Sequence, residues 1–232
     1  MRMNILGLDT AQPACSAALL MEGGALFARF EEMTKGHAEA LAPMAEAVLE
    51  EAGITPADLD LIAVTIGPGT FTGTRVALSF ARGLGAALRL PVLGLTSLEV
   101  LAEPAVAREG ELIAASFDAR RGEIYLQLFE PDLTPASAPA LAKLDGLTLP
   151  GDLSGRPLCL VGTGSALLAE VLEDSHALRA SGAPALPQAA AAARLAKAHV
   201  ARAGLPALGA PPEPLYLREA DAKLPKAGGA LR

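Results

Sequence analysis

The chain turns at Gly67-Pro68-Gly69-Thr70-Phe71-Thr72-Gly73-Thr74-Arg75, between a β-branched apolar run at residues 61–66 and a longer apolar run at residues 76–88. The first run predicts a buried strand, and the second predicts a helix capped by Thr72 or Thr74. A helix start after a glycine turn favours an anion, because its first N–H groups are unpaired. The turn lacks the Gly-Lys-Ser/Thr ending of a P-loop, so a plain tight turn in an α/β domain remains the alternative.

The helix after the turn is apolar on almost every side. Ala77, Ala81 and Gly85 recur every four residues and form a ridge of small side chains, while Val76 and Phe80 lie on a neighbouring face. Such a helix is buried on more than one side. We therefore expect one side to cover the sheet and another to meet a neighbouring helix or another chain.

Composition limits the classes of function. The net charge of −7 argues against a protein that holds nucleic acid unaided, because phosphate neutralisation needs clustered Lys and Arg. Cys15 and Cys159 are too few for a disulfide framework and lie in apolar runs, which indicates buried thiols in a reducing compartment. No signal peptide or membrane span is evident, so we expect a cytoplasmic protein.

Both halves of the chain repeat one pattern: a strand, an Asp, a tight turn and a second strand. The first strand of each half ends at Asp9 or Asp118, and Arg120-Arg121-Gly122 forms the second turn. This repeat predicts a two-lobed α/β fold. Paired Asp residues facing a cleft would suit a magnesium-bound phosphate. The alternative is that each Asp accepts hydrogen bonds from its own turn.

The remaining segments complete the expected organisation. Residues 97–108 and 188–202 predict helices, and residues 131–157 predict loops because their periodicity is weak. We expect an N-terminal lobe at residues 1–108, a C-terminal lobe at residues 109–218 and a flexible tail at residues 219–232.

Six motifs in register resemble the TsaB (YeaZ) family. They lie within residues 5–218 and are Ile5–Ala11, Ala14–Ser16, Gly67–Arg75, Asp118–Tyr125, Val161–Gly164 and Glu213–Arg218. The resemblance implies two ribonuclease-H-like lobes of the actin-like, sugar-kinase and Hsp70-type ATPase superfamily, in agreement with the repeat.

The resemblance also implies a function in tRNA modification, namely threonylcarbamoyl transfer to N6 of the adenine beside the anticodon. It implies pairing with the catalytic relative TsaD and the ATPase TsaE, contact with tRNA only through that complex, and a homodimer when alone. It places the partner surface on the helices at residues 37–52 and 74–89. The predicted surface residues are His37, Leu41, Ala45, Val48, Ala77, Ala81 and Gly85.

The chain departs from its catalytic relative at a metal site. Alignment on the Gly-Pro-Gly turn puts Ser97 and Leu101 where the relative has a His-x-x-x-His pair, and Leu cannot ligate a metal. We therefore expect no bound metal, assign no catalytic residue and predict a non-catalytic subunit.

A nucleotide site is implied by resemblance to the superfamily, with ATP or ADP and magnesium at or near a subunit junction. The candidate residues are Asp9, Thr10, Gly67, Gly69, Asp118, Gly162 and Gly164. Two other hypotheses remain open. One is a free-standing ATP-dependent small-molecule kinase, for which 232 residues is short; the other is a metalloprotease, for which metal ligands are missing.

Overall fold

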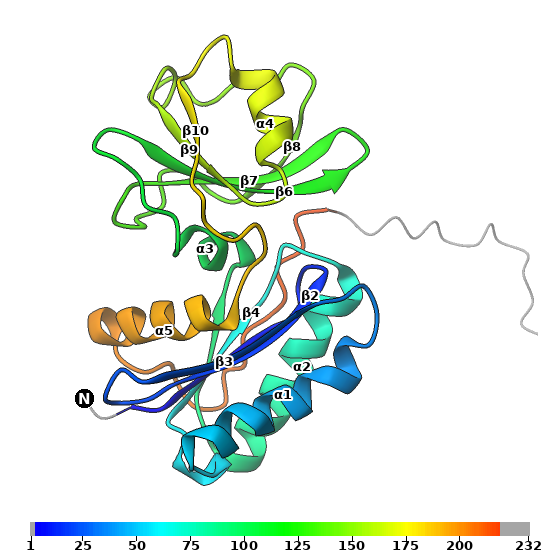
Figure 1. The fold of residues 1–232 in the computed structure, drawn as a ribbon, viewed down its shortest axis with the longest axis vertical. Helices are drawn as coiled ribbons and strands as arrows, with labels where there is room; N and C mark the ends of the chain where they lie inside the picture. Colours follow the sequence, from blue (N-terminus) through cyan, green and yellow to red (C-terminus); the bar gives the residue numbers. More distant parts are fainter. Residues whose placement is uncertain (1–2, 219–232) are drawn as a thin grey trace, which may run out of the picture.

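The computed structural model describes residues 3–218, and the tail expected at residues 219–232 lies outside them. The first of its two sheets has the strand order β3-β2-β1-β4-β5 (Figure 1). Strand β1 pairs antiparallel with β2 and parallel with β4. The strands are Ile5–Asp9 (β1), Ala14–Leu20 (β2), Leu26–Glu32 (β3), Leu61–Thr65 (β4) and Val92–Leu95 (β5).

Helices cover both faces of the first sheet. His37–Ala52 (α1) and Phe71–Leu88 (α2) lie on one face, and Ala189–Ala203 (α5) lies on the other (Figure 1). A short 3-10 helix, Pro56–Asp58 (η1), precedes β4. Strands β1, β2 and β4 are buried along their whole length, which explains why their sequences are continuous apolar runs rather than alternating ones.

The second sheet has the strand order β8-β7-β6-β9-β10. This is the order of the first sheet, with β6 in the place of β1, β7 in the place of β2 and so on. The strands of the second sheet are Leu112–Arg120 (β6), Glu123–Phe129 (β7), Ala140–Lys143 (β8), Leu158–Val161 (β9) and Leu178–Ala180 (β10). Ser165–Leu172 (α4) packs on one face of this sheet, and Ser97–Ala102 (α3) packs on β6 and β7 between the lobes (Figure 1). The predicted pair of ribonuclease-H-like lobes is therefore confirmed.

Two local predictions differ from the structure. The helix expected at residues 97–108 ends at Ala102, shortly before Pro104, which lacks the N–H that a continuing helix would need. Thr96 caps this helix by accepting a hydrogen bond from the Glu99 N–H at 3.1 Å. Strand β8 lies in the segment expected to be loops, because pairing with β7 rather than local periodicity determines it.

The division of the chain at residue 108 does not match the packing of α5. This helix belongs to the second half of the sequence, but its alanines pack on β1, β2 and β4 of the first sheet. A Cβ added to Gly7 would lie 2.2 Å from the carbonyl oxygen of Ala189, so the helix approaches the sheet closely. Within residues 3–218, no helix is long and apolar enough to span a membrane.

We predict that Gly7→Ala destabilises the protein by roughly 1–3 kcal/mol, because the new methyl group would push α5 away from β1. The matched control is Gly83→Ala in α2, where an added Cβ meets no atom within 4 Å. The control should stabilise the helix by about 0.5–1 kcal/mol. Urea unfolding of both variants measures the difference, and equal stabilities would contradict this account of α5.

Candidate functional site

A cleft of about 800 Å³ lies where the two lobes meet. The start of α1, the glycine turn and the β6–β7 hairpin contribute most of its walls. Of the residues predicted from the sequence, His37, Gly69 and Asp118 line the cleft. The other nucleotide candidates are not among its lining residues, so the structure brings together only part of the predicted set.

Asp9 is the last residue of β1 and is fully inaccessible to solvent. Its Oδ1 accepts hydrogen bonds from the Thr65 hydroxyl at 2.5 Å and from the Ala11 N–H at 3.3 Å. Its Oδ2 has no partner within the described residues. Burial raises the pKa of Asp9 to about 7, against hydrogen bonds that lower it. The carboxyl group therefore forms its hydrogen bonds inside the lobe and does not line the cleft.

The Thr10 side chain, directly after β1, forms hydrogen bonds with the backbone of α2. Its hydroxyl donates to the Gly73 carbonyl at 2.6 Å and accepts from the Ala77 N–H at 3.0 Å. An added Cβ at Gly73 would lie 2.1 Å from the Thr10 carbonyl oxygen, and one at Gly69 would lie 2.2 Å from the Ala11 carbonyl oxygen. These glycines are therefore required by close packing inside the lobe.

The helix begins earlier than predicted. Helix α2 starts at Phe71, and its N-cap is Thr70, whose side chain accepts a hydrogen bond from the Gly73 N–H at 3.1 Å. The two residues predicted as caps lie inside the helix instead: Thr72 is exposed on its first turn, and Thr74 is buried. Gly67 has φ of +103° and packs against the Leu215 carbonyl, so it also has a structural role.

Asp118 accepts a hydrogen bond from its own turn, as the alternative hypothesis expected. Its Oδ1 accepts from the Arg120 N–H at 2.7 Å, and its Oδ2 lies 3.4 Å from the Arg120 guanidinium. Gly162 and Gly164 both pack on Ser116. A Cβ added to Gly162 would lie 2.1 Å from the Ser116 carbonyl oxygen, and one added to Gly164 would lie 2.8 Å from the Ser116 hydroxyl.

Ser97 and Leu101 are both buried in the interior where the lobes meet. The Ser97 N–H donates to the Gly67 carbonyl at 2.8 Å, and Leu101 packs against Gly162. Across residues 3–218, no three His, Cys, Asp or Glu side chains lie close enough together to hold a metal ion.

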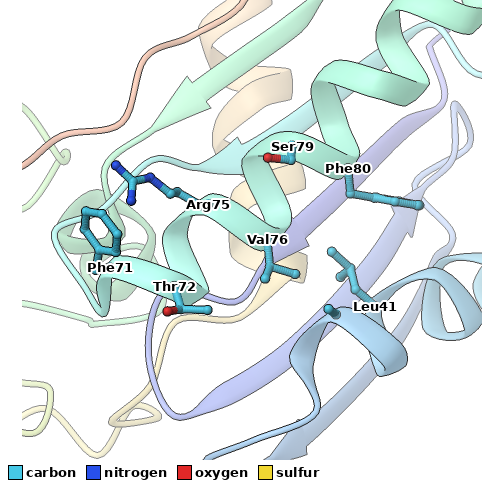
Figure 2. A pocket seen from close by; sticks show the side chains of 8 residues that line it. Leu41, Phe71, Thr72, Arg75, Val76, Ser79 and Phe80 are labelled. Carbon is cyan, nitrogen blue, oxygen red and sulfur yellow. The ribbon is translucent and has the colours of Figure 1, made fainter. Parts of the chain in front are cut away.

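A second candidate site is an apolar groove of about 420 Å³ between α1 and α2 (Figure 2). Val76 and Phe80 project from α2 on the side toward Leu41 of α1, and Phe71 and Arg75 lie side by side near the start of α2. The lining residues are Ala38, Leu41, Phe71, Thr72, Arg75, Val76, Ser79 and Phe80. We call this surface the α1–α2 groove.

The small-residue ridge of α2 faces this chain's own sheet. Ala77 and Ala81 are fully buried, and an added Cβ at Gly85 would lie 2.6 Å from the Val92 side chain. Ala45 and Val48 are buried in the same core. These five residues are buried inside the lobe and have almost no surface with which to contact a partner. The prediction that they form the partner surface was therefore wrong.

Two residues of the predicted interface do lie at cavities: Leu41 lines the α1–α2 groove, and His37 lines the interlobe cleft. Sequence reasoning did not select Phe71, Arg75 or Phe80 as surface residues. The sequence pattern could have indicated Phe80, since Val76 and Phe80 form a second apolar stripe on the helix, beside the ridge of small residues.

Two lobes of identical strand order, joined at a cleft, define the class of two-lobed α/β proteins with ribonuclease-H-like lobes. A family model described as "TsaD: tRNA N6-adenosine threonylcarbamoyltransferase" matches residues 31–226. The TsaB protein of Bacillus subtilis is 31% identical over 178 residues, which cover 74% of this chain and 76% of that protein. The chain therefore belongs to the TsaB (YeaZ) family.

Two further relatives agree. The TsaB protein of Escherichia coli is 36% identical over 131 residues, and the match spans 56% of each chain, about half the length of that relative. The solved structure of YeaZ from Pseudomonas aeruginosa is 34% identical and superposes with a TM-score of 0.79, covering 93% of this chain and 100% of that one.

We predict that the stability of the protein falls as pH rises from about 4 to about 7. In this range the unfolded Asp9 side chain has lost its proton, while the folded one retains it until its pKa near 7. The fall amounts to about 4 kcal/mol for this group. The Asp9→Asn variant should lack this fall in stability with pH. The control variant Asp145→Asn, at an exposed position, should show the same fall as the wild type.

Urea unfolding at several pH values gives the comparison. The difference in stability between the wild type and Asp9→Asn should depend on pH, and the difference for Asp145→Asn should not. If both differences are independent of pH, Asp9 has an ordinary pKa in the folded protein.

Proposed function

We propose that this chain is a non-catalytic, complex-forming subunit in the transfer of a threonylcarbamoyl group to N6 of the adenine beside the anticodon in tRNA. It acts by pairing with the catalytic relative TsaD, and the ATPase TsaE joins the complex. The names of the relatives support the pathway, since those from E. coli and B. subtilis are called tRNA threonylcarbamoyladenosine biosynthesis protein TsaB.

The observation that supports a docking role best is the α1–α2 groove. It is mostly apolar, and Phe71 at its edge has 58% of its surface exposed. A large exposed apolar side chain beside an apolar groove is typical of a surface that a partner covers. The proposed docking surface is therefore the outward side of α1 and α2, next to the buried ridge.

The state of the predicted nucleotide-binding residues supports a subunit without chemistry of its own. Asp9 and Thr10 are used inside the fold, and Asp118 is engaged by its own turn. A kinase would need an accessible base and carboxylates to hold magnesium in the cleft. The packing therefore favours the subunit hypothesis over the kinase hypothesis.

The charge of the chain supports contact with tRNA through the complex. A net charge of −7 opposes the approach of a phosphate backbone, because binding requires Lys and Arg to neutralise phosphates. The purified chain alone should show negligible affinity for tRNA at physiological salt.

Reconstitution tests the function directly. Threonylcarbamoyl transfer to tRNA is measured with TsaD and TsaE in the presence and in the absence of this chain. The proposal expects transfer only when the chain is present. Equal transfer without it would contradict a required role, and phosphorylation of a small molecule by the chain alone would support the kinase instead.

We predict that Ser79→Arg weakens binding to TsaD roughly 30-fold or more, because a bulky charge would occupy the groove and be desolvated in the contact. Ser79 is exposed, so the substitution removes no core side chain. The matched control is Ala87→Arg, at an exposed position of the same helix outside the groove. Titration calorimetry compares the two variants, and equal affinities would place the interface elsewhere.

A further inference from the structure

Arg75 is an exposed cation held in place by aromatic rings. Its guanidinium carbon lies 3.3 Å from the centre of the Phe71 ring and 5.4 Å from the centre of the Tyr216 ring. The two rings stack on each other with centres 5.7 Å apart. Tyr216 comes from the extended C-terminal segment, so residues far apart in the sequence build one cluster. Figure 2 shows Arg75 and Phe71 together at the start of α2.

The charge of Arg75 has no acidic partner within residues 3–218. Its side chain makes no ion pair or hydrogen bond with that part of the chain, whereas Arg29 and Arg218 pair with Glu51 and Glu123. Among the residues that the structure describes, no Asp or Glu lines the α1–α2 groove. A fixed guanidinium therefore faces outward beside an apolar surface.

Stacking leaves the hydrogen-bonding edge of this guanidinium available. An aromatic ring contacts the flat face of the group, while the N–H donors point outward in its plane. That edge matches the two oxygens of a carboxylate, which can accept two parallel hydrogen bonds. Because the rings already restrict the side chain, less conformational entropy is lost when a carboxylate binds.

We infer that Arg75 binds a carboxylate on the partner helix that occupies the α1–α2 groove. The inference rests on the proposed function, and it adds the chemistry that the partner must present. A groove between two helices accommodates a third helix whose apolar side chains enter it. The partner helix has an Asp or Glu three or four residues from an apolar side chain, so that both lie on the same face.

This arrangement divides the recognition between two kinds of contact. The apolar part of the groove, around Val76 and Phe80, provides area but little selectivity. Arg75 rejects partner helices that lack the carboxylate, because the contact would then cover a cation without a counter-charge.

The test compares two charge reversals on the same helix. Arg75→Glu places a carboxylate opposite the partner's carboxylate. Arg89→Glu makes the same change in net charge at the exposed C-cap of α2, outside the α1–α2 groove. Both substitutions are on the surface, and thermal unfolding checks that each variant is folded. Binding to purified TsaD is then measured by titration calorimetry at low and high salt.

The inference expects Arg75→Glu to weaken binding at least tenfold, and Arg89→Glu to change it less than twofold. A third variant, Arg75→Met, keeps the stem and removes the charge, and it should show a smaller salt dependence than the wild type. Equal effects of the two reversals would overturn the inference.

The outcomes separate this inference from the proposed function. If Ser79→Arg prevents binding while Arg75→Glu and Arg75→Met bind like the wild type, the groove is the interface and the carboxylate contact is wrong. If neither position affects binding, or the wild type does not bind TsaD, both the surface and the contact are wrong.

Discussion

The hydroxyl of Thr10 joins the end of β1 to the first turns of α2, and the rest of the first lobe depends on this junction. It bonds to the Gly73 carbonyl and to the Ala77 N–H at once, across more than 60 residues of sequence. The contact is possible because Gly69 and Gly73 bring no Cβ between the two backbones. The glycine turn, whose composition suits an anion site, is therefore used to attach a helix to a strand.

That attachment fixes which side of α2 faces outward. The small ridge at Ala77 and Ala81 enters the core, and Phe71, Arg75 and Phe80 remain at the surface beside α1. The extended C-terminal segment adds Tyr216 to this surface. One helix thus provides both the close contact that stabilises the lobe and the surface proposed for docking.

Much of the fold could be predicted from the sequence, because the first strand of each lobe is an apolar run that leads into Asp9 or Asp118 and is followed by a turn and a second strand. Strand β8 and the location of α5 could not be predicted, since they depend on pairing and packing with distant segments. The candidate site was predicted less well. Small residues every four positions indicate a close contact, but the sequence does not say whether the neighbour at Ala81 is the chain's own sheet or a partner.

A spin label on the outward face of α2 tests the docking account most directly. Cys15 and Cys159 are buried, so a cysteine introduced at Ser79 can be labelled selectively with a nitroxide. A label at Glu170 of α4, exposed on the second lobe, serves as the reference. On addition of TsaD, the account predicts that the label at position 79 becomes immobilised and the one at position 170 stays mobile. A complex in which the label at position 79 keeps its mobility would contradict it.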